Sequence, residues 1–272
     1  MAALAPDVLI QLGPLPITNT IVNTLLVDSV ILGGVLALKN NVKKIPGTLQ
    51  NIVEMVVSGF YGLTEQIAGV ENTKKIFPYF ITFFLFILVA NWSGLLPGGE
   101  SIGFIHPVEV ATEHTSEAKA VDAEHAEKPE LISLNRNLTS DLNATLALAI
   151  ISLVATHMLS IKTLGLKDYL GRFFSLNPIL LFVGILEIVS EFTKIISLSF
   201  RLFGNIFAGE VVLGTISKLF AFGFPVPFMF LEIIVGLVQA LVFSMLTMVF
   251  MSVLMTSHHA EEHDAAKEVS HT

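Results

Sequence analysis

The sequence predicts an all-α membrane protein that forms one multi-pass domain over residues 1–272. Hydrophobic residues make up 53% of the chain and charged residues only 14%, whereas soluble domains carry roughly 25% charge. Five apolar stretches are each long enough to cross about 30 Å of hydrocarbon, which takes roughly 20 helical residues. We therefore expect about five transmembrane helices, together with one amphipathic helix at the membrane surface.

The five apolar stretches differ in length, and the last two are the longest. At about 1.5 Å rise per residue, the forty residues of the fourth stretch would form a helix of roughly 60 Å. These two helices must therefore tilt or bend, and we expect them to form a hairpin through a turn near residues 223–227. The expected spans cover residues 17–38, 77–96, 140–161, 178–217 and 226–256.

Residues 46–70, between the first two spans, have a different pattern. Glu54 and Glu65 interrupt an otherwise apolar segment, which is typical of an amphipathic helix that lies in the membrane interface. A sixth span is the less favoured alternative here.

The acidic residues are concentrated in two segments. Of the 23 acids, eight fall within residues 100–130 and four within 258–272. The formal charge of -8 is therefore a property of an acidic loop at 97–138 and a His- and Glu-rich tail at 257–272. Because Leu-Pro-Gly-Gly begins this loop, we expect an exposed excursion.

The basic residues predict the orientation, because cytoplasmic loops are enriched in Lys and Arg. Counted by side of the membrane, nine lie on one side and four on the other. This ratio places the N-terminus outside, the acidic loop on the outer face and the C-terminus in the cytoplasm. No Lys or Arg precedes Lys39, so the first apolar stretch does not resemble a secretory signal and is expected to be retained.

We expect no metal or cofactor site. Cysteine is absent, which excludes disulfides and thiolate ligands. Six histidines lie in Ala- and Glu-rich segments, whereas a zinc site needs three or four ligands at fixed geometry. His157, inside the third span, is either a supporting functional residue or one that merely faces a wet seam between helices. The six are His106, His114, His125, His258, His259 and His263.

Ionisable residues interrupt an otherwise apolar run over residues 187–210. A charge at the centre of a membrane helix costs roughly 2.5–3.5 kcal/mol, so each one requires an explanation. At 100° per residue, several polar side chains fall within about 40° of Arg201, whereas Glu210 points about 180° away. One helix therefore presents Arg201 to one environment and Glu210 to another. The polar stripe around Arg201 comprises Glu187, Ser190, Lys194, Ser197 and Asn205.

Arg201 is the residue of this run that is hardest to explain by packing. No acid lies three or four residues away on its own helix, so its partner must come from another segment or another subunit. The outer members of the run have an equally good structural explanation, in which Glu187 or Glu191 pairs with Lys194 and holds helices together.

The last span carries Glu232 and Gln239, which lie about 20° apart on one helical face. They either pack inertly or form, with Glu210, a wet path along which carboxylates exchange protons. Straight pairing about the expected turn leaves Glu210 and Glu232 some 12 Å apart along the helix axis. It also places Gln239 deeper, close to the level of Arg201.

Residues 197–210, Ser-Leu-Ser-Phe-Arg-Leu-Phe-Gly-Asn-Ile-Phe-Ala-Gly-Glu, resemble the signature helix of subunit a of bacterial F-type ATP synthases. The resemblance covers most of residues 17–256, and the family has either His or Glu at the position of Glu232. The His-rich loop and tail depart from the family pattern. Further matching positions are Glu187, Ser190 and Lys194 upstream, Glu232 through Gln239 downstream, and Asp141 and Asn143 in Asp-Leu-Asn-Ala-Thr.

This resemblance implies a proton-channel stator subunit of the bacterial inner membrane, which has no catalytic activity alone and couples ion flow to ATP synthesis. Its partners would be the ring of c subunits, the peripheral-stalk b subunits and membrane lipid, with no nucleic acid. Arg201 would be the essential charge that faces the ring between two half-channels. The proton path would include Ser197, Asn205, Glu210, Glu232 and Gln239.

Two other functions compete with this one. A proton- or sodium-coupled secondary transporter would be expected to show repeated halves and a broken helix, and we find no internal repeat. A structural membrane assembly subunit would use its polar stripe only to bind its neighbours.

Overall fold

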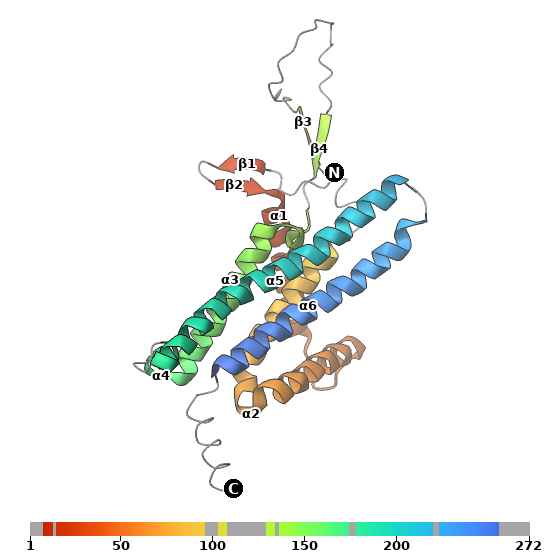
Figure 1. Ribbon diagram of the computed structural model, residues 1–272. Helices are drawn as coiled ribbons and strands as arrows, with labels where there is room; N and C mark the ends of the chain where they lie inside the picture. The colour runs from red at the N-terminus through yellow and green to blue at the C-terminus, as the bar shows by residue number, and fades with distance from the viewer. Residues whose placement is uncertain are drawn as a thin grey trace, which may run out of the picture.

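The computed structural model describes residues 8–12, 15–95, 103–107, 129–133, 136–173, 178–219 and 223–255. It is a bundle of long helices with two short β-hairpins at one end (Figure 1). Five of the described helices are long and apolar enough to cross a membrane, which confirms the predicted fold class. The tail at 257–272, most of the acidic loop and the side chains of the six histidines lie outside this description.

The first span is α1, Asn19–Asn41, which follows the antiparallel hairpin of β1, Val8–Leu12, and β2, Leu15–Thr18. Only a narrow stripe of α1 is buried, and it ends at Val27. Most of the exposed side chains of α1 are apolar, although Asp28 and Ser29 are exposed too; Leu25 and Leu32, for example, are 63% and 62% exposed. Such an outward apolar surface suits a helix surrounded by lipid.

The predicted interfacial helix and the second span form one element, α2, Thr48–Ser93. It bends at Gly69, where φ is 75° and ψ is 160°, a conformation that side chains other than glycine rarely adopt. Figure 1 shows the two arms of α2 diverging at this bend. The helix expected at residues 46–70 is thus confirmed as a helix, and residues 51–59 are exposed throughout.

The third span, α3, Leu142–Leu164, begins after the short 3-10 helix η2, Leu138–Ser140. Asp141 caps its first turn by accepting a hydrogen bond from the Asn143 N–H at 2.9 Å. The helix ends at Gly165, whose φ of 88° turns the chain into α4, Leu166–Phe173.

The last two spans are α5, Pro178–Leu219, and α6, Pro225–Met255, and they form the expected long hairpin (Figure 1). The turn was predicted near residues 223–227, but α6 already begins at Pro225. Proline is favoured in the first turn of a helix, where its missing N–H is not needed. The connection is therefore centred near residue 222, midway between the two helix ends.

The bundle core lies where α2, α3, α5 and α6 meet. Phe83, Phe84 and Ile87 of α2 pack with Leu202 of α5 and Phe243 of α6. Polar side chains also join the helices, as expected where lipid gives no hydrophobic drive for association. Ser152 and Thr247 lie 2.8 Å apart between α3 and α6, and Thr145 and Ser199 lie 3.2 Å apart between α3 and α5.

The two β-hairpins were not predicted from the sequence, and neither was the short helix α4. The second hairpin pairs β3, Gly103–Pro107, with β4, Pro129–Ser133, in antiparallel register. Strands of four or five residues give too short a pattern of period two to be distinguished from loop segments.

Candidate functional site

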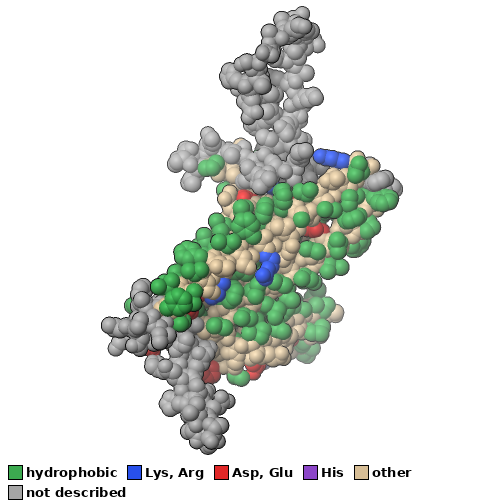
Figure 2. Space-filling view, in the orientation of Figure 1, with side chains coloured by type: hydrophobic (Ala, Val, Ile, Leu, Met, Phe, Trp, Pro, Cys, Tyr) green, Lys and Arg blue, Asp and Glu red, His purple; other side chains and the backbone are tan. Residues whose placement is uncertain are grey.

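Arg201 stands near the middle of α5 with an exposed side chain. Figure 2 shows basic groups among apolar side chains on the face formed by α5 and α6. The guanidinium donates one hydrogen bond, from Nη2 to Ser197 Oγ at 3.5 Å, within its own helix. Among the described residues, no carboxylate forms a salt bridge with it. Its charge is therefore directed outward from the chain.

One turn further along α5, Asn205 contacts the last helix. Its Nδ2 donates to Gln239 Oε1 at 2.7 Å, which joins two residues that were predicted to share a path. Gln239 is only 4% exposed, and its Nε2 has no hydrogen-bond partner within the described parts of the chain. A buried amide donor without a partner is unfavourable, so this group is suited to hydrogen-bond water or another ligand.

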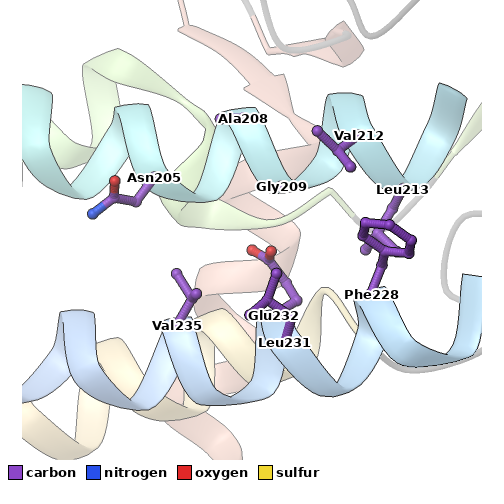
Figure 3. A pocket seen from close by; sticks show the side chains of 9 residues that line it. All are labelled: Asn205, Ala208, Gly209, Val212, Leu213, Phe228, Leu231, Glu232 and Val235. Atoms are coloured by element: carbon purple, nitrogen blue, oxygen red, sulfur yellow. The ribbon is translucent and has the colours of Figure 1, made fainter. Parts of the chain in front are cut away.

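A cleft of about 300 Å³ between α5 and α6 begins beside this amide pair (Figure 3). Glu232 projects from α6 across the cleft toward α5, and its side chain is 9% exposed. Because a water molecule occupies about 30 Å³ in the liquid, the cleft has room for several. The lining residues are Asn205, Ala208, Gly209, Val212, Leu213, Phe228, Leu231, Glu232 and Val235.

Gly209 allows the Glu232 carboxylate to approach α5 closely. A Cβ atom added at Gly209 would overlap both carboxylate oxygens of Glu232. The glycine thus provides the space in which this buried acid lies. Sequence reasoning missed this role. The available signal was a glycine inside a predicted span, next to Glu210 and opposite a helix that carries Glu232.

Glu210 follows Gly209 and is partly exposed, but it does not line the cleft. The contact between Gly209 and Glu232 places Glu210 and Glu232 at nearly the same level of the hairpin. The axial separation of some 12 Å that the sequence predicted between Glu210 and Glu232 was therefore wrong, because the connection is centred three residues earlier than expected. Counted from residue 222, Glu210 lies twelve residues before the centre and Glu232 ten after it.

The residues predicted as supporting members separate into two groups. The first is a polar cluster deeper along α5, where Lys194 Nζ lies 2.7 Å from Glu191 Oε1 and His157 Nε2 lies 3.6 Å from Glu191 Oε2. The structural pairing of Glu191 with Lys194 is therefore confirmed. The pairing of Glu191 with His157 was missed, because the sequence does not show which faces of α3 and α5 meet.

The second group serves the start of α3. Asp141 is buried as the helix cap and also accepts a hydrogen bond from Thr20 Oγ1 of α1 at 3.4 Å. The Asn143 side chain is exposed, and so is that of Ser190 on α5, whereas Glu187 is partly buried. Capping gives Asp141 a sufficient structural role.

Asn91 at the end of α2 was not predicted, yet it supports the α6 wall of the site. Its Nδ2 donates to the Gly236 carbonyl at 2.9 Å, and its Oδ1 accepts from Thr139 Oγ1 at 2.7 Å. Gly236 lies between Glu232 and Gln239 on α6. The sequence signal that could have identified Asn91 is the presence of a polar residue at the end of an apolar span.

Comparison with known proteins identifies the family of this chain. Residues 20–252 match the family model described as ATP synthase A chain. The ATP synthase subunit a of Moorella thermoacetica is 31% identical over 258 residues, which cover 95% of this chain and 100% of that relative. The chain therefore belongs to the ATP synthase subunit a family.

Proposed function

We propose that this chain is the proton-conducting stator subunit of an F-type ATP synthase, and that Arg201 faces a rotating ring of c subunits. Family membership makes the chain a multi-pass membrane component of the ATP synthase complex. The c ring and the peripheral-stalk b subunits are the partners that we propose for it. ATP chemistry then belongs to other subunits of the complex.

The observation that carries the proposal is the exposed Arg201 in the middle of a long apolar helix. An isolated charge at membrane depth costs roughly 2.5–3.5 kcal/mol, so a partner outside the chain is required. An ionised carboxylate on the ring is the complementary group, because guanidinium pairs strongly with carboxylates.

The cleft beside Glu232 supports a half-channel that leads protons from the outer side toward Arg201. Water in the cleft would deliver a proton to the Glu232 carboxylate, as intramembrane acids commonly do in pumps. Asn205 lines the cleft one turn along α5 from Arg201 and donates to Gln239, and these two amides would orient water for the next transfer. Glu210, at the level of Glu232, would provide a second carboxylate near the entrance.

The role of Arg201 follows from its permanent charge. Guanidinium does not release its proton in a protein, so it blocks direct proton flow past itself. It also favours the ionised form of a ring carboxylate, which promotes proton release on one side before reloading from the other. Each charge that crosses gains about 2.3 kcal/mol per 100 mV of membrane potential.

The orientation belongs to the same proposal. With the N-terminus outside and the C-terminus in the cytoplasm of a bacterial cell, the α5–α6 turn lies on the outer face. The cleft at Glu232 would then form the outer half-channel, and the deeper part of α5 toward Lys194 would lie on the inner side.

Arg201→Lys tests the proposal, because lysine keeps a charge but can lose its proton when desolvated. We expect assembled complexes with this change to lose proton-driven ATP synthesis. Lys218→Arg, the reverse exchange at an exposed position of the same helix, is the matched control and should leave synthesis unchanged. Retained coupling in Arg201→Lys complexes would instead favour a structural assembly subunit, and substrate uptake by this chain alone would favour a transporter.

A further inference from the structure

We propose that His157 is a proton-exchange group of the inner half of the pathway, and that Glu191 and Tyr169 hold it in position. This inference rests on the proposed function, since it assigns a residue to the inner half-channel. The three side chains come from α3, α4 and α5, so they meet only because these helices pack together.

The imidazole of His157 has one partner at each nitrogen. Its Nδ1 lies 2.9 Å from the Tyr169 hydroxyl, and its Nε2 lies 3.6 Å from Glu191 Oε2. The two rings also meet edge to face, with centroids 5.9 Å apart. The orientation of the imidazole is thus fixed from both sides, as proton-transfer groups require.

The two oxygens of the Glu191 carboxylate differ in their hydrogen bonding, which is consistent with transient protonation of His157. Its Oε1 accepts from Lys194 at 2.7 Å, whereas Oε2 accepts no hydrogen bond within the described residues. Glu191 is only 7% exposed, so bulk water does not readily satisfy the second oxygen. A protonated His157 would donate from Nε2 to this oxygen, whereas a neutral His157 with its lone pair on Nε2 would not.

The charges that act on His157 come from the helices packed against α3. Helix α5 contributes Glu191, Lys194 and Glu187, and α4 contributes Tyr169. Glu232 is the only ionisable residue in the sequence of α6, and it lies near the opposite end of the hairpin. Among the described side chains, the charges that act on His157 are thus the Glu191 and Glu187 carboxylates and the Lys194 ammonium.

The position of the cluster suits the inner side. His157 lies seven residues before the end of α3, or about 10 Å from the end of that helix. Glu191 lies ten residues before Arg201, or about 15 Å along α5. The His157 side chain is 20% exposed, so water reaches part of the ring.

The proton balance is simple. In the neutral tautomer that this cycle uses, Nδ1–H donates to the Tyr169 oxygen and Nε2 holds a lone pair. A proton delivered through water from the ring carboxylate adds to Nε2, and the resulting imidazolium donates to Glu191 Oε2. Release of that proton from Nε2 to cytoplasmic water restores the first tautomer, so one proton enters and one leaves.

The test is passive proton flux through the membrane sector in inverted vesicles stripped of the ATPase head, where the external pH sets the cytoplasmic side. Because an imidazole gains and loses a proton as the pH changes, the wild-type flux should show a pH-dependent step on that side. His157→Gln should lower the flux by about tenfold and remove this step. Thr193→Val is the matched control, since Thr193 is exposed and its hydroxyl donates to the Val189 carbonyl of its own helix.

A His157→Gln complex with wild-type flux and an unchanged pH step would overturn the inference. If this variant does not assemble, Glu191→Gln supplies the test. It should displace the step to lower pH, because the imidazolium loses its neighbouring negative charge, and an unmoved step would reject the assignment. Arg201→Lys in vesicles that keep the ATPase head separates the two proposals. Retained ATP synthesis there rejects the proposed function, whereas failure at His157 alone rejects only this inference.

Discussion

Gly209→Ala is a small change that should close the space used by Glu232. The added Cβ would overlap the carboxylate, and overpacking of this kind costs about 1–3 kcal/mol. Alanine regains about 1 kcal/mol of helix propensity relative to glycine. The obstructing atoms are the far end of a flexible side chain, so Glu232 can rotate away. We expect a net destabilisation of about 0–2 kcal/mol, with assembly retained and the carboxylate displaced from the cleft.

The assay is passive proton conduction in stripped vesicles, normalised to the amount of assembled subunit. Gly209→Ala should lower conduction to the level of Glu232→Gln, and the double variant should show no further loss, because both changes remove the same group. Gly214→Ala is the control: an added Cβ there meets nothing within 4 Å, and the position lies about 140° from Arg201 around α5. Additive losses in the double variant, or equal flux in the two glycine variants, would refute the reasoning.

Three further predictions test the path, the fold and the orientation. Glu210→Gln and Glu232→Gln should each slow passive proton flux without preventing assembly, because each removes a relay group and keeps a polar side chain; unchanged flux in both would make these acids structural. Asp141→Ala should destabilise the subunit by about 0.5–2 kcal/mol, measured by thermal denaturation of the purified complex, because α3 loses its cap; Asn143→Ala, at an exposed side chain, should not. Since the chain has no cysteine, single cysteines can report the orientation. Ile45→Cys, at a position 87% exposed, should react with an impermeant thiol reagent from the cytoplasmic side, and Phe224→Cys, at a position 58% exposed, from the outer side. Labelling from the opposite sides would reverse the orientation.

Hydropathy predicted the helices well, because the need to bury about 20 apolar residues per crossing constrains the sequence strongly. The spans expected at 140–161 and 178–217 appear as Leu142–Leu164 and Pro178–Leu219. Helical periodicity also placed Arg201 and Asn205 on one face. The bounds of a span and the face on which a residue lies depend only on the sequence of that helix, so they can be predicted without knowing how helices pack.

Contacts between helices were harder to predict. The level of Glu232 relative to Glu210 depends on where α6 begins, and an error of three residues in the centre of the turn misplaced it by several ångströms. The space above Gly209 exists only because Glu232 packs against it. The meeting of His157 with Glu191 likewise depends on how α3 packs on α5, which periodicity within either helix does not encode.

The most direct test of the central claim is proton leak through assembled Arg201→Ala complexes, measured together with ATP synthesis. If Arg201 separates two half-channels, its loss should abolish synthesis and open a leak. The leak should depend on the ring carboxylate, which would still carry protons between the channels, and should disappear when that group is replaced by an amide. ATP synthesis at the wild-type rate in Arg201→Ala complexes, with no added leak, would contradict the account.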